Sequence, residues 1–307
     1  MPSLEDLKPF LVLGLALGGV FAMSGVGLVV LFRATGVLNL AYGAVGALCA
    51  LISWSFLGGV NQWIAYAVGI ACGGAITLIY GVLLGPPFAA RDPLVKATAT
   101  IGLLLILLGV LLWVWPPSTT RSYILPTRLW SYEVAGERIN WTQIVGVLFP
   151  IVVTAGTAIF LRVSKVGTAM RALANDREAT AMLGVPVRRV EAAAWLGSGL
   201  VCGMTGVLLG DLVGLDIVTL TFLVIPALAA ALIGQLRSLW VTLAGGFVIG
   251  IVQSSLTAFS GVKIGDTSLA EYRTMAPFVL AILALLWFAR RRPRSDLHLG
   301  TPCNRRT

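Results

Sequence analysis

Long apolar runs recur along almost the whole of this chain, and they constrain its fold more than any other feature. A helix that crosses a lipid bilayer needs about 20 predominantly apolar residues. Because lipid offers no hydrogen-bond partners, the backbone polar groups of such a segment must be satisfied within it, as an α-helix allows. There are nine candidate runs: residues 10–32, 37–56, 63–88, 96–115, 142–161, 191–214, 217–234, 239–259 and 275–289. The sequence therefore predicts an all-α, polytopic membrane protein with eight to nine transmembrane or re-entrant helices.

The composition agrees with a chain that lies almost entirely in the lipid bilayer. Of its 307 residues, 58% are hydrophobic and 11% are charged, whereas about 25% of residues are charged in soluble domains. The connections between the runs leave no stretch longer than about 30 residues for a separate soluble domain. We therefore expect residues 1–307 to form a single transmembrane domain.

Basic residues are distributed unevenly between the two sets of connections. Lysine and arginine number 22 against 13 acidic residues, a formal net charge of +9. If all nine runs cross the membrane, sixteen basic residues fall in one set of connections and six in the other. Basic loops tend to stay in the cytoplasm, so we expect residues 162–190 and the basic tail at residues 290–307 to be cytoplasmic. This explanation of the positive charge leaves no indication of a nucleic-acid partner.

The side of the N-terminus is left open, because only residues 33–36 separate the first two runs. Either of these two runs is compatible with a re-entrant or broken segment that lines a cavity instead of crossing the membrane. Eight crossings would place the N-terminus in the cytoplasm, and nine would place it outside. In both cases we expect a multi-pass protein of the cell membrane, plasma or inner, with a cytoplasmic C-terminus.

Residues with catalytic or metal-binding chemistry are scarce and scattered. Cys49, Cys72, Cys202 and Cys303 have no C-x-x-C spacing, and His298 is the only histidine in the sequence. This arrangement matches neither a zinc site nor a catalytic triad. None of the four lysines follows a glycine, so the chain also lacks the glycine-rich loop whose lysine binds nucleotide phosphates. We expect a transporter subunit rather than an enzyme, with no metal and no cofactor bound by this chain.

Charged residues are almost absent from the centres of the runs. An ion-coupled carrier usually holds an ionisable residue near the bilayer midplane, so this pattern argues against ion coupling. Asp211 and Asp216 lie near the outer end of the run at residues 191–214, and we expect their carboxylates to be solvated.

Several glycines are spaced four residues apart within the runs. Gly14 and Gly18 form one such pair, and Gly199 and Gly203 form another. This spacing places bare backbone on one face of a helix, so a neighbouring helix can approach closely. We therefore predict tight helix packing at these faces.

The connection at residues 162–190 is the longest cytoplasmic one between runs and is dense in charge. Its portion from Arg171 to Gly184 is rich in helix formers, and Gly184 can take the left-handed conformation that ends a helix. Pro186 then prevents continuation. The predicted helix is either an interfacial linker or a segment that docks in a groove on a soluble motor subunit, with small residues such as Ala179 allowing close approach.

At this segment the sequence resembles the permease subunits of branched-chain amino acid ABC transporters, of the high-affinity leucine, isoleucine and valine type. The similarity is carried by Lys165-Val-Gly-Thr-Ala-Met-Arg-Ala172, by Asn175-Asp176, by Ala179 and by Met182-Leu-Gly-Val185, which look like that family's coupling loop. Glu178, Ala179 and Gly184 are the positions carried over, and we group Arg171 and Asp176 with them. The resemblance implies that these residues meet a separate ATPase subunit, which would bind ATP and Mg.

A second segment, Gly36-Val-Leu-Asn-Leu-Ala-Tyr-Gly43, is similar to a motif near the N-terminus of the same family. The family usually has histidine where Tyr42 stands and an acidic residue where Ala44 stands. We predict that Asn39, Tyr42 and Gly43 line the substrate path, because Asn39 and Tyr42 are polar groups in an otherwise apolar stretch. The alternative is that Asn39 only forms a hydrogen bond between helices.

The resemblance implies alternating access. ABC ATPase subunits, a second permease subunit and an extracytoplasmic solute-binding protein would be the partners. The solute, and whether the permease pair is a homodimer or a heterodimer, are left open. A secondary carrier and a non-transporting membrane scaffold are the alternatives.

Overall fold

The computed structural model describes residues 4–88, 91–116, 121, 123, 125–134, 137–259, 263–264 and 267–291. Twelve α-helices make up most of this part of the chain. They are α1 (Leu4–Thr35), α2 (Tyr42–Phe56), α3 (Gln62–Phe88), α4 (Pro93–Val114), α5 (Trp141–Val163), α6 (Lys165–Asn175), α7 (Arg177–Met182), α8 (Val187–Val213), α9 (Ile217–Phe222), α10 (Val224–Ile233), α11 (Leu239–Ala258) and α12 (Ala276–Arg291).

Every predicted apolar run corresponds to helix. Among the described residues, six helical segments are long and apolar enough to cross a membrane: Leu7–Thr35, Gln62–Gly85, Leu94–Val114, Trp141–Val163, Val187–Val213 and Leu239–Ala258. Three shorter apolar segments accompany them: Tyr42–Phe56, Ile217–Ile233 and Tyr272–Phe288. The prediction of an all-α polytopic membrane protein is therefore confirmed. The last residues of the basic tail, 292–307, lie outside the described part of the chain.

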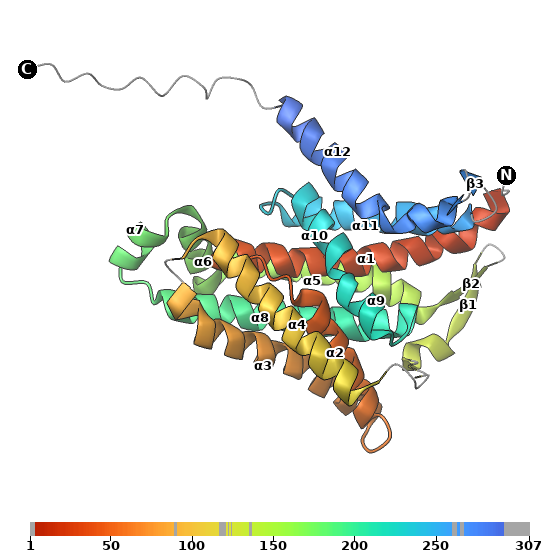
Figure 1. Ribbon diagram of the computed structural model, residues 1–307, viewed down its shortest axis with the longest axis horizontal. Coiled ribbons are helices and arrows are strands. Elements are labelled where there is room, and N and C mark those ends of the chain that lie inside the picture. The colour runs from red at the N-terminus through yellow and green to blue at the C-terminus, as the bar shows by residue number, and fades with distance from the viewer. Residues whose placement is uncertain are drawn as a thin grey trace, which may run out of the picture.

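The long helix α1 lies at the centre of the bundle, and α11 runs beside it (Figure 1). A Cβ atom added to Gly18 would lie 2.8 Å from the Cα atom of Phe247, and one added to Gly14 would lie 2.9 Å from the Cβ atom of Ser254. Such distances leave no room for a larger residue at either glycine. The close packing predicted from the spacing of Gly14 and Gly18 is confirmed.

The second glycine pair, Gly199 and Gly203, also allows two helices to pack closely, in this case α3 and α8. A Cβ atom on Gly203 would lie 2.7 Å from the Cα atom of Ile70. Next to this contact, the buried Thr77 hydroxyl donates a 2.9 Å hydrogen bond to the carbonyl of Trp195. Close backbone approach and interhelical hydrogen bonds hold membrane helices together where lipid gives no hydrophobic drive.

Two long helices end at a glycine in the left-handed region and are followed by shorter helices. α1 is followed by Gly36 at φ +68, and α8 by Gly214 at φ +96. Each glycine permits a reversal that an ordinary residue would strain. After these breaks come α2 and α9, which contact each other inside the bundle.

The two ends of the bundle differ in structure. α6 and α7 project at one end, and a hairpin of β1 (Ser131–Val134) and β2 (Glu137–Asn140) lies at the other (Figure 1). The hairpin follows the 3₁₀ helix η1 (Pro126–Leu129). A second short hairpin, β3 (Lys263–Ile264) with β4 (Thr267–Ser268), precedes the 3₁₀ helix η2 (Leu269–Thr274).

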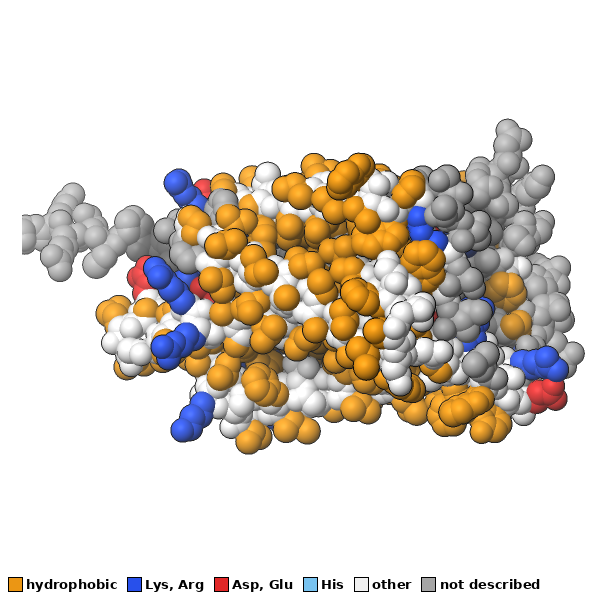
Figure 2. Space-filling view, turned by 90° about the horizontal axis from the view of Figure 1, so that it is seen from below, with side chains coloured by type: hydrophobic (Ala, Val, Ile, Leu, Met, Phe, Trp, Pro, Cys, Tyr) orange, Lys and Arg blue, Asp and Glu red, His pale blue; other side chains and the backbone are white. Residues whose placement is uncertain are grey.

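A broad apolar band separates these ends (Figure 2). Figure 2 shows basic side chains gathered mainly beyond the band at either end, with the acidic ones near them. This is the distribution expected of a surface that faces lipid in the middle and water at its ends.

Candidate functional site

The segment between α5 and α8 contains two helices rather than the single one predicted from Arg171 to Gly184. The chain is extended at Asp176, with φ −151 and ψ 110, and the Asp176 carboxylate accepts a 3.0 Å hydrogen bond from the backbone N–H of Ala179. An aspartate in this position caps the first turn of a helix. The prediction of one continuous helix was wrong because Asp176 begins α7 instead of lying within a helix.

The far end of α7 exposes a pair of large apolar side chains. Met182 is 81% exposed and Leu183 is 83% exposed. Gly184 follows them at φ +80, which confirms the left-handed helix end predicted from the sequence. The predicted coupling residues Arg171, Asp176, Glu178, Ala179 and Gly184 are all exposed. We call Met182 and Leu183, together with the exposed residues of α7, the α7 tip.

Contacts with the spanning helices hold α6 and α7 in place. A Cβ atom on Gly167 would lie 2.5 Å from the Cα atom of Leu161, so α6 approaches the backbone of α5 closely. The Arg177 guanidinium forms an ion pair with the Glu191 carboxylate of α8. The Arg171 guanidinium donates a 3.4 Å hydrogen bond to the carbonyl of Arg162. The α7 tip therefore projects from a segment that is tied to α5 and α8.

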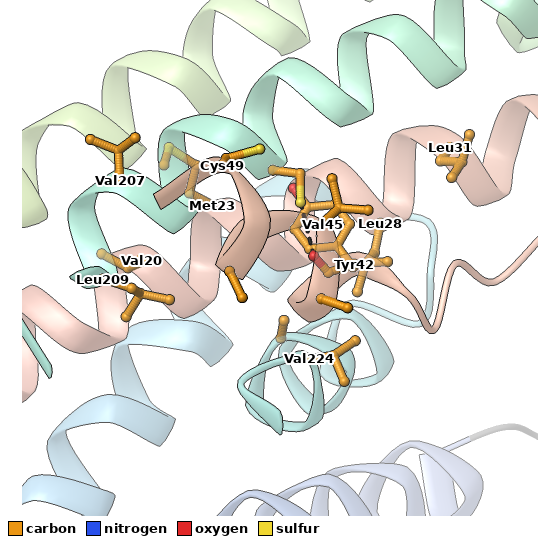
Figure 3. Packing of buried hydrophobic residues seen from close by; sticks show 14 of the residues in the cluster. Val20, Met23, Leu28, Leu31, Tyr42, Val45, Cys49, Val207, Leu209 and Val224 are labelled. Carbon is orange, nitrogen blue, oxygen red and sulfur yellow. Dashed lines mark hydrogen bonds between the residues drawn. The ribbon is translucent and has the colours of Figure 1, made fainter. Parts of the chain in front are cut away.

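The predicted path residues Asn39, Tyr42 and Gly43 are all buried at the start of α2. The Asn39 side-chain oxygen accepts a 3.1 Å hydrogen bond from the N–H of Ala41. Within the described chain, the Asn39 amide nitrogen and the Tyr42 hydroxyl form no hydrogen bond that meets the usual distance and angle limits, although the Thr205 side chain interacts with the Tyr42 hydroxyl. Figure 3 shows Tyr42 beside Leu28 and Val45. Both polar groups are therefore poorly satisfied in an apolar interior.

Gly43 brings α2 against α9. A Cβ atom at this position would overlap the carbonyl oxygen of Thr221. A cavity of only about 10 Å³ lies at this crossing, and its lining includes Tyr42, Gly43 and Leu220. That volume holds about one water molecule. The crossing of α2 and α9 is closed in this structure.

A third polar site, which the sequence interpretation missed, lies at the hairpin end of the bundle. The Asp211 side chain is only 1% exposed. Its carboxylate accepts a 2.9 Å hydrogen bond from the N–H of Leu125 and lies 3.8 Å from the Arg128 guanidinium, which also donates to the Asp211 carbonyl at 3.0 Å. The expectation of a solvated carboxylate at Asp211 was wrong, because the loop before the hairpin folds over it. We call this arrangement the Asp211 clasp.

Neighbouring groups in the clasp are aromatic. The rings of Tyr66 and Tyr123 meet edge to face with centroids 6.1 Å apart. Burial raises the pKa of the Tyr123 phenol well above its usual range, so this group stays neutral. Asp216, by contrast, is exposed as expected and caps α9 by accepting a 2.8 Å hydrogen bond from the N–H of Thr219.

The described residues contain no group of three His, Cys, Asp or Glu side chains that could hold a metal ion. Cys49, Cys72 and Cys202 are free thiols. The buried Cys202 thiol donates to the carbonyl of Tyr42 at 2.9 Å, which links α8 to the start of α2. It acts as a packing residue with a weak donor.

The sequence matches a protein-family model over residues 10–286, and that model is described as branched-chain amino acid transport system / permease component. The high-affinity branched-chain amino acid transport system permease protein LivH of Escherichia coli (strain K12) is 25% identical over 290 residues, with 89% of this chain and 91% of the relative covered. The corresponding permease protein BraD of Pseudomonas aeruginosa is 25% identical over 304 residues, with coverage of 94% and 95%.

A solved structure titled PsaBC from Streptococcus pneumoniae in complex with Fab aligns with 91% of each chain. Its sequence identity is 17% and its TM-score is 0.48.

Proposed function

The chain belongs to the branched-chain amino acid transport permease family, and we propose that it is the membrane-spanning subunit of an ATP-binding-cassette importer. It would carry branched-chain amino acids or related small polar solutes by alternating access. Hydrolysis of ATP, with its Mg, would take place on separate ATPase subunits. A second permease subunit and an extracytoplasmic solute-binding protein would complete the importer. The family match over residues 10–286 is the observation that carries this proposal.

The orientation follows from the positions of the basic residues. Residues 162–190 and the tail at residues 290–307 hold many of the arginines, so the end of the bundle with α6 and α7 would face the cytoplasm. The hairpin of β1 and β2 would then face the outside. In this orientation the α7 tip is presented to cytoplasmic subunits and the Asp211 clasp lies on the side where solute arrives.

The α7 tip has the properties of a contact that transmits force. Exposed apolar side chains such as Met182 and Leu183 can enter a groove on a partner. The ion pair between Arg177 and Glu191 ties α7 to α8, which reaches the interior beside α2 through Cys202. Movement of the tip would therefore pass along a packed helix toward the closed crossing of α2 and α9.

The crossing of α2 and α9 is the proposed gate on the solute path. The buried hydroxyl of Tyr42 and the unpartnered amide nitrogen of Asn39 would be available to a solute once the helices separate. An unpaired buried polar group is costly, so its retention in an apolar interior supports a role in binding.

The first test changes the α7 tip. We expect Ala179→Arg to reduce ATP-dependent uptake at least tenfold while the protein stays in the membrane, because a bulky charge would enter the docking contact. Gly184→Leu should act similarly, since a leucine in the left-handed region costs about 1 to 2 kcal/mol. Asp92→Arg is the matched control, because Asp92 is exposed before α4 and its side chain makes no capping hydrogen bond, and it should leave uptake unchanged.

Expression, ATPase co-purification and uptake are measured together in these variants. Normal uptake with fully retained ATPase in Ala179→Arg would contradict a coupling role for α7. The purified chain alone should hydrolyse no ATP, because its sequence lacks a phosphate-binding loop.

The second test concerns the solute path. Tyr42→Phe removes one buried hydroxyl without changing the ring, and we expect the KM of uptake to rise roughly fivefold, equivalent to one hydrogen bond of about 1 kcal/mol. Tyr66→Phe is the matched control, since its hydroxyl is also buried without a partner and Tyr66 does not line the cavity at the crossing. Uptake of leucine, valine, urea and short amides in parallel would identify the solute. An equal KM in both variants would remove Tyr42 from the path.

A further inference from the structure

A cavity of about 630 Å³ with a basic lining opens near the end of the bundle that carries α7. Four cationic side chains line it: Arg33, Lys96, Arg177 and Arg237. Among its described lining residues there is no carboxylate. We call it the basic cavity. Of these four cations, the proposed transport mechanism uses only Arg177, through its ion pair with Glu191.

The four cations come from four separate parts of the chain. Arg33 is in the last turn of α1, Lys96 in the first turn of α4, Arg177 at the start of α7 and Arg237 in the turn between α10 and α11. The Arg171 side chain lies close enough to Arg33 for their charges to repel. Like charges gathered in one cavity oppose folding unless an anion offsets them. The nearby Glu191 carboxylate offsets part of this charge, because it pairs with Arg177 and its charge also acts on Lys96.

The turn that carries Arg237 is itself strained. Gln235 and Leu236 both lie in the left-handed region, at φ 53 and φ 55, although neither is glycine. The turn brings the Arg237 carbonyl within 3.2 Å of the Arg33 guanidinium, which donates a hydrogen bond to it. Strained backbone of this kind is concentrated at ligand clamps and functional sites.

The position of the cavity indicates which anion it takes. Arg33 and Lys96 lie at the ends of the spanning segments Leu7–Thr35 and Leu94–Val114, at the level where lipid headgroups meet protein. Apolar walls from Phe32, Leu173 and Leu236 adjoin the cations. Arginine pairs bind phosphate oxygens in a planar, two-pronged geometry, and basic pockets between spanning helices on the cytoplasmic side bind anionic headgroups.

We propose that the basic cavity binds a phosphate group, supplied by an anionic phospholipid of the inner leaflet. A bound phosphate would join α1, α4, α7 and the turn between α10 and α11. The proposal rests on the cavity and its charges, and it stands or falls independently of the transported solute.

The test measures lipid retained by the full chain. The protein is purified from vesicles of equal parts phosphatidylglycerol and phosphatidylcholine, and bound lipid is measured by native mass spectrometry. We expect preferential retention of phosphatidylglycerol. Arg237→Gln should reduce this preference about fivefold, because each cation near an anionic lipid contributes about 1 kcal/mol to binding. The Arg237 carbonyl that accepts from Arg33 is unchanged in this variant, so the turn can still form.

Four further variants sharpen the measurement. Arg33→Lys keeps the charge but loses the two-pronged geometry, so it should lower the preference less than Arg33→Gln does. Glu191→Gln removes the carboxylate that Arg177 engages and should increase it. Arg189→Gln is the matched control, because Arg189 is exposed on α8 outside the cavity lining, and it should change nothing.

Soluble phosphate is separated from lipid by a second measurement. If inorganic phosphate raises the Tm in pure phosphatidylcholine, and Arg237→Gln abolishes that shift, the phosphate site is supported but its source is soluble. Equal lipid retention by Arg237→Gln and Arg189→Gln, with no phosphate effect, would overturn the site. Loss of ATPase co-purification in Arg237→Gln alone, with lipid retention unchanged, would also overturn it and assign the cavity to a carboxylate of a partner protein.

Discussion

Each end of the bundle carries an arginine–carboxylate pair, and the two pairs differ in what surrounds them. At the hairpin end, Arg128 meets the Asp211 carboxylate, whose side chain is 1% exposed. At the opposite end, Arg177 meets Glu191, whose side chain is 12% exposed. Asp211 also accepts from a loop N–H, whereas Glu191 joins one helix to another.

The difference indicates that one ion pair holds a loop in a fixed position and that the other joins two helices that can move relative to each other. The Asp211 carboxylate accepts a hydrogen bond from the N–H of Leu125, the residue that precedes η1, and so it fastens that loop to α8. Both arginines are partly exposed, but water reaches the Glu191 carboxylate more readily than the Asp211 carboxylate, so the Arg177 and Glu191 pair can separate at lower cost. We expect the first pair to contribute mainly to stability and the second to the transmission of movement.

The largest effect on stability is expected at the Asp211 clasp. Asp211→Ala should lower the free energy of unfolding by about 2 to 3 kcal/mol, because it leaves the buried Leu125 N–H without an acceptor. Asp211→Asn keeps an acceptor for that N–H and should lose about half as much. Thermal unfolding in detergent measures both. A clasp that contributes nothing would leave the Tm of Asp211→Ala unchanged.

A smaller effect is expected for the pair at α7. Glu191→Gln should cost about 0.5 to 1 kcal/mol, since the Arg177 side chain is 38% exposed and water screens the pair. Uptake should fall more than the unfolding free energy suggests, because α7 would lose its tie to α8. Stability and uptake are measured on the same preparation. A loss of stability as large as that of Asp211→Ala would erase the distinction between the two ends.

The smallest effect is expected in the hairpin. Glu133 and Arg138 form an exposed pair with a 3.4 Å separation across β1 and β2. Glu133→Gln should change the free energy of unfolding by less than about 0.5 kcal/mol, because exposed ion pairs contribute little. The Glu133→Gln variant is therefore the reference against which the losses in Asp211→Ala and Glu191→Gln are compared. A Tm shift comparable to that of Glu191→Gln would mean that the hairpin is held by this pair.

The spanning helices were predictable from the sequence for a local reason. In lipid each segment must satisfy its own backbone, so about 20 apolar residues in a row are sufficient to specify a helix. The end of α7 was predictable in the same way, because the left-handed conformation at Gly184 depends on the residue itself. The break at Asp176 was missed because the flanking residues favour helix, while a single carboxylate was able to cap a new one.

Neighbouring residues were sufficient to predict which segments are helical and which glycines lie on packing faces. What those helices meet depends instead on the folded bundle. Asp211 is buried because Leu125 and Arg128, more than 80 residues away in the chain, fold over it. Gly43 is essential at its crossing because the backbone of Thr221 arrives there from α9. Contacts of this kind depend on how the helices assemble, and no local pattern of residue types encodes that assembly.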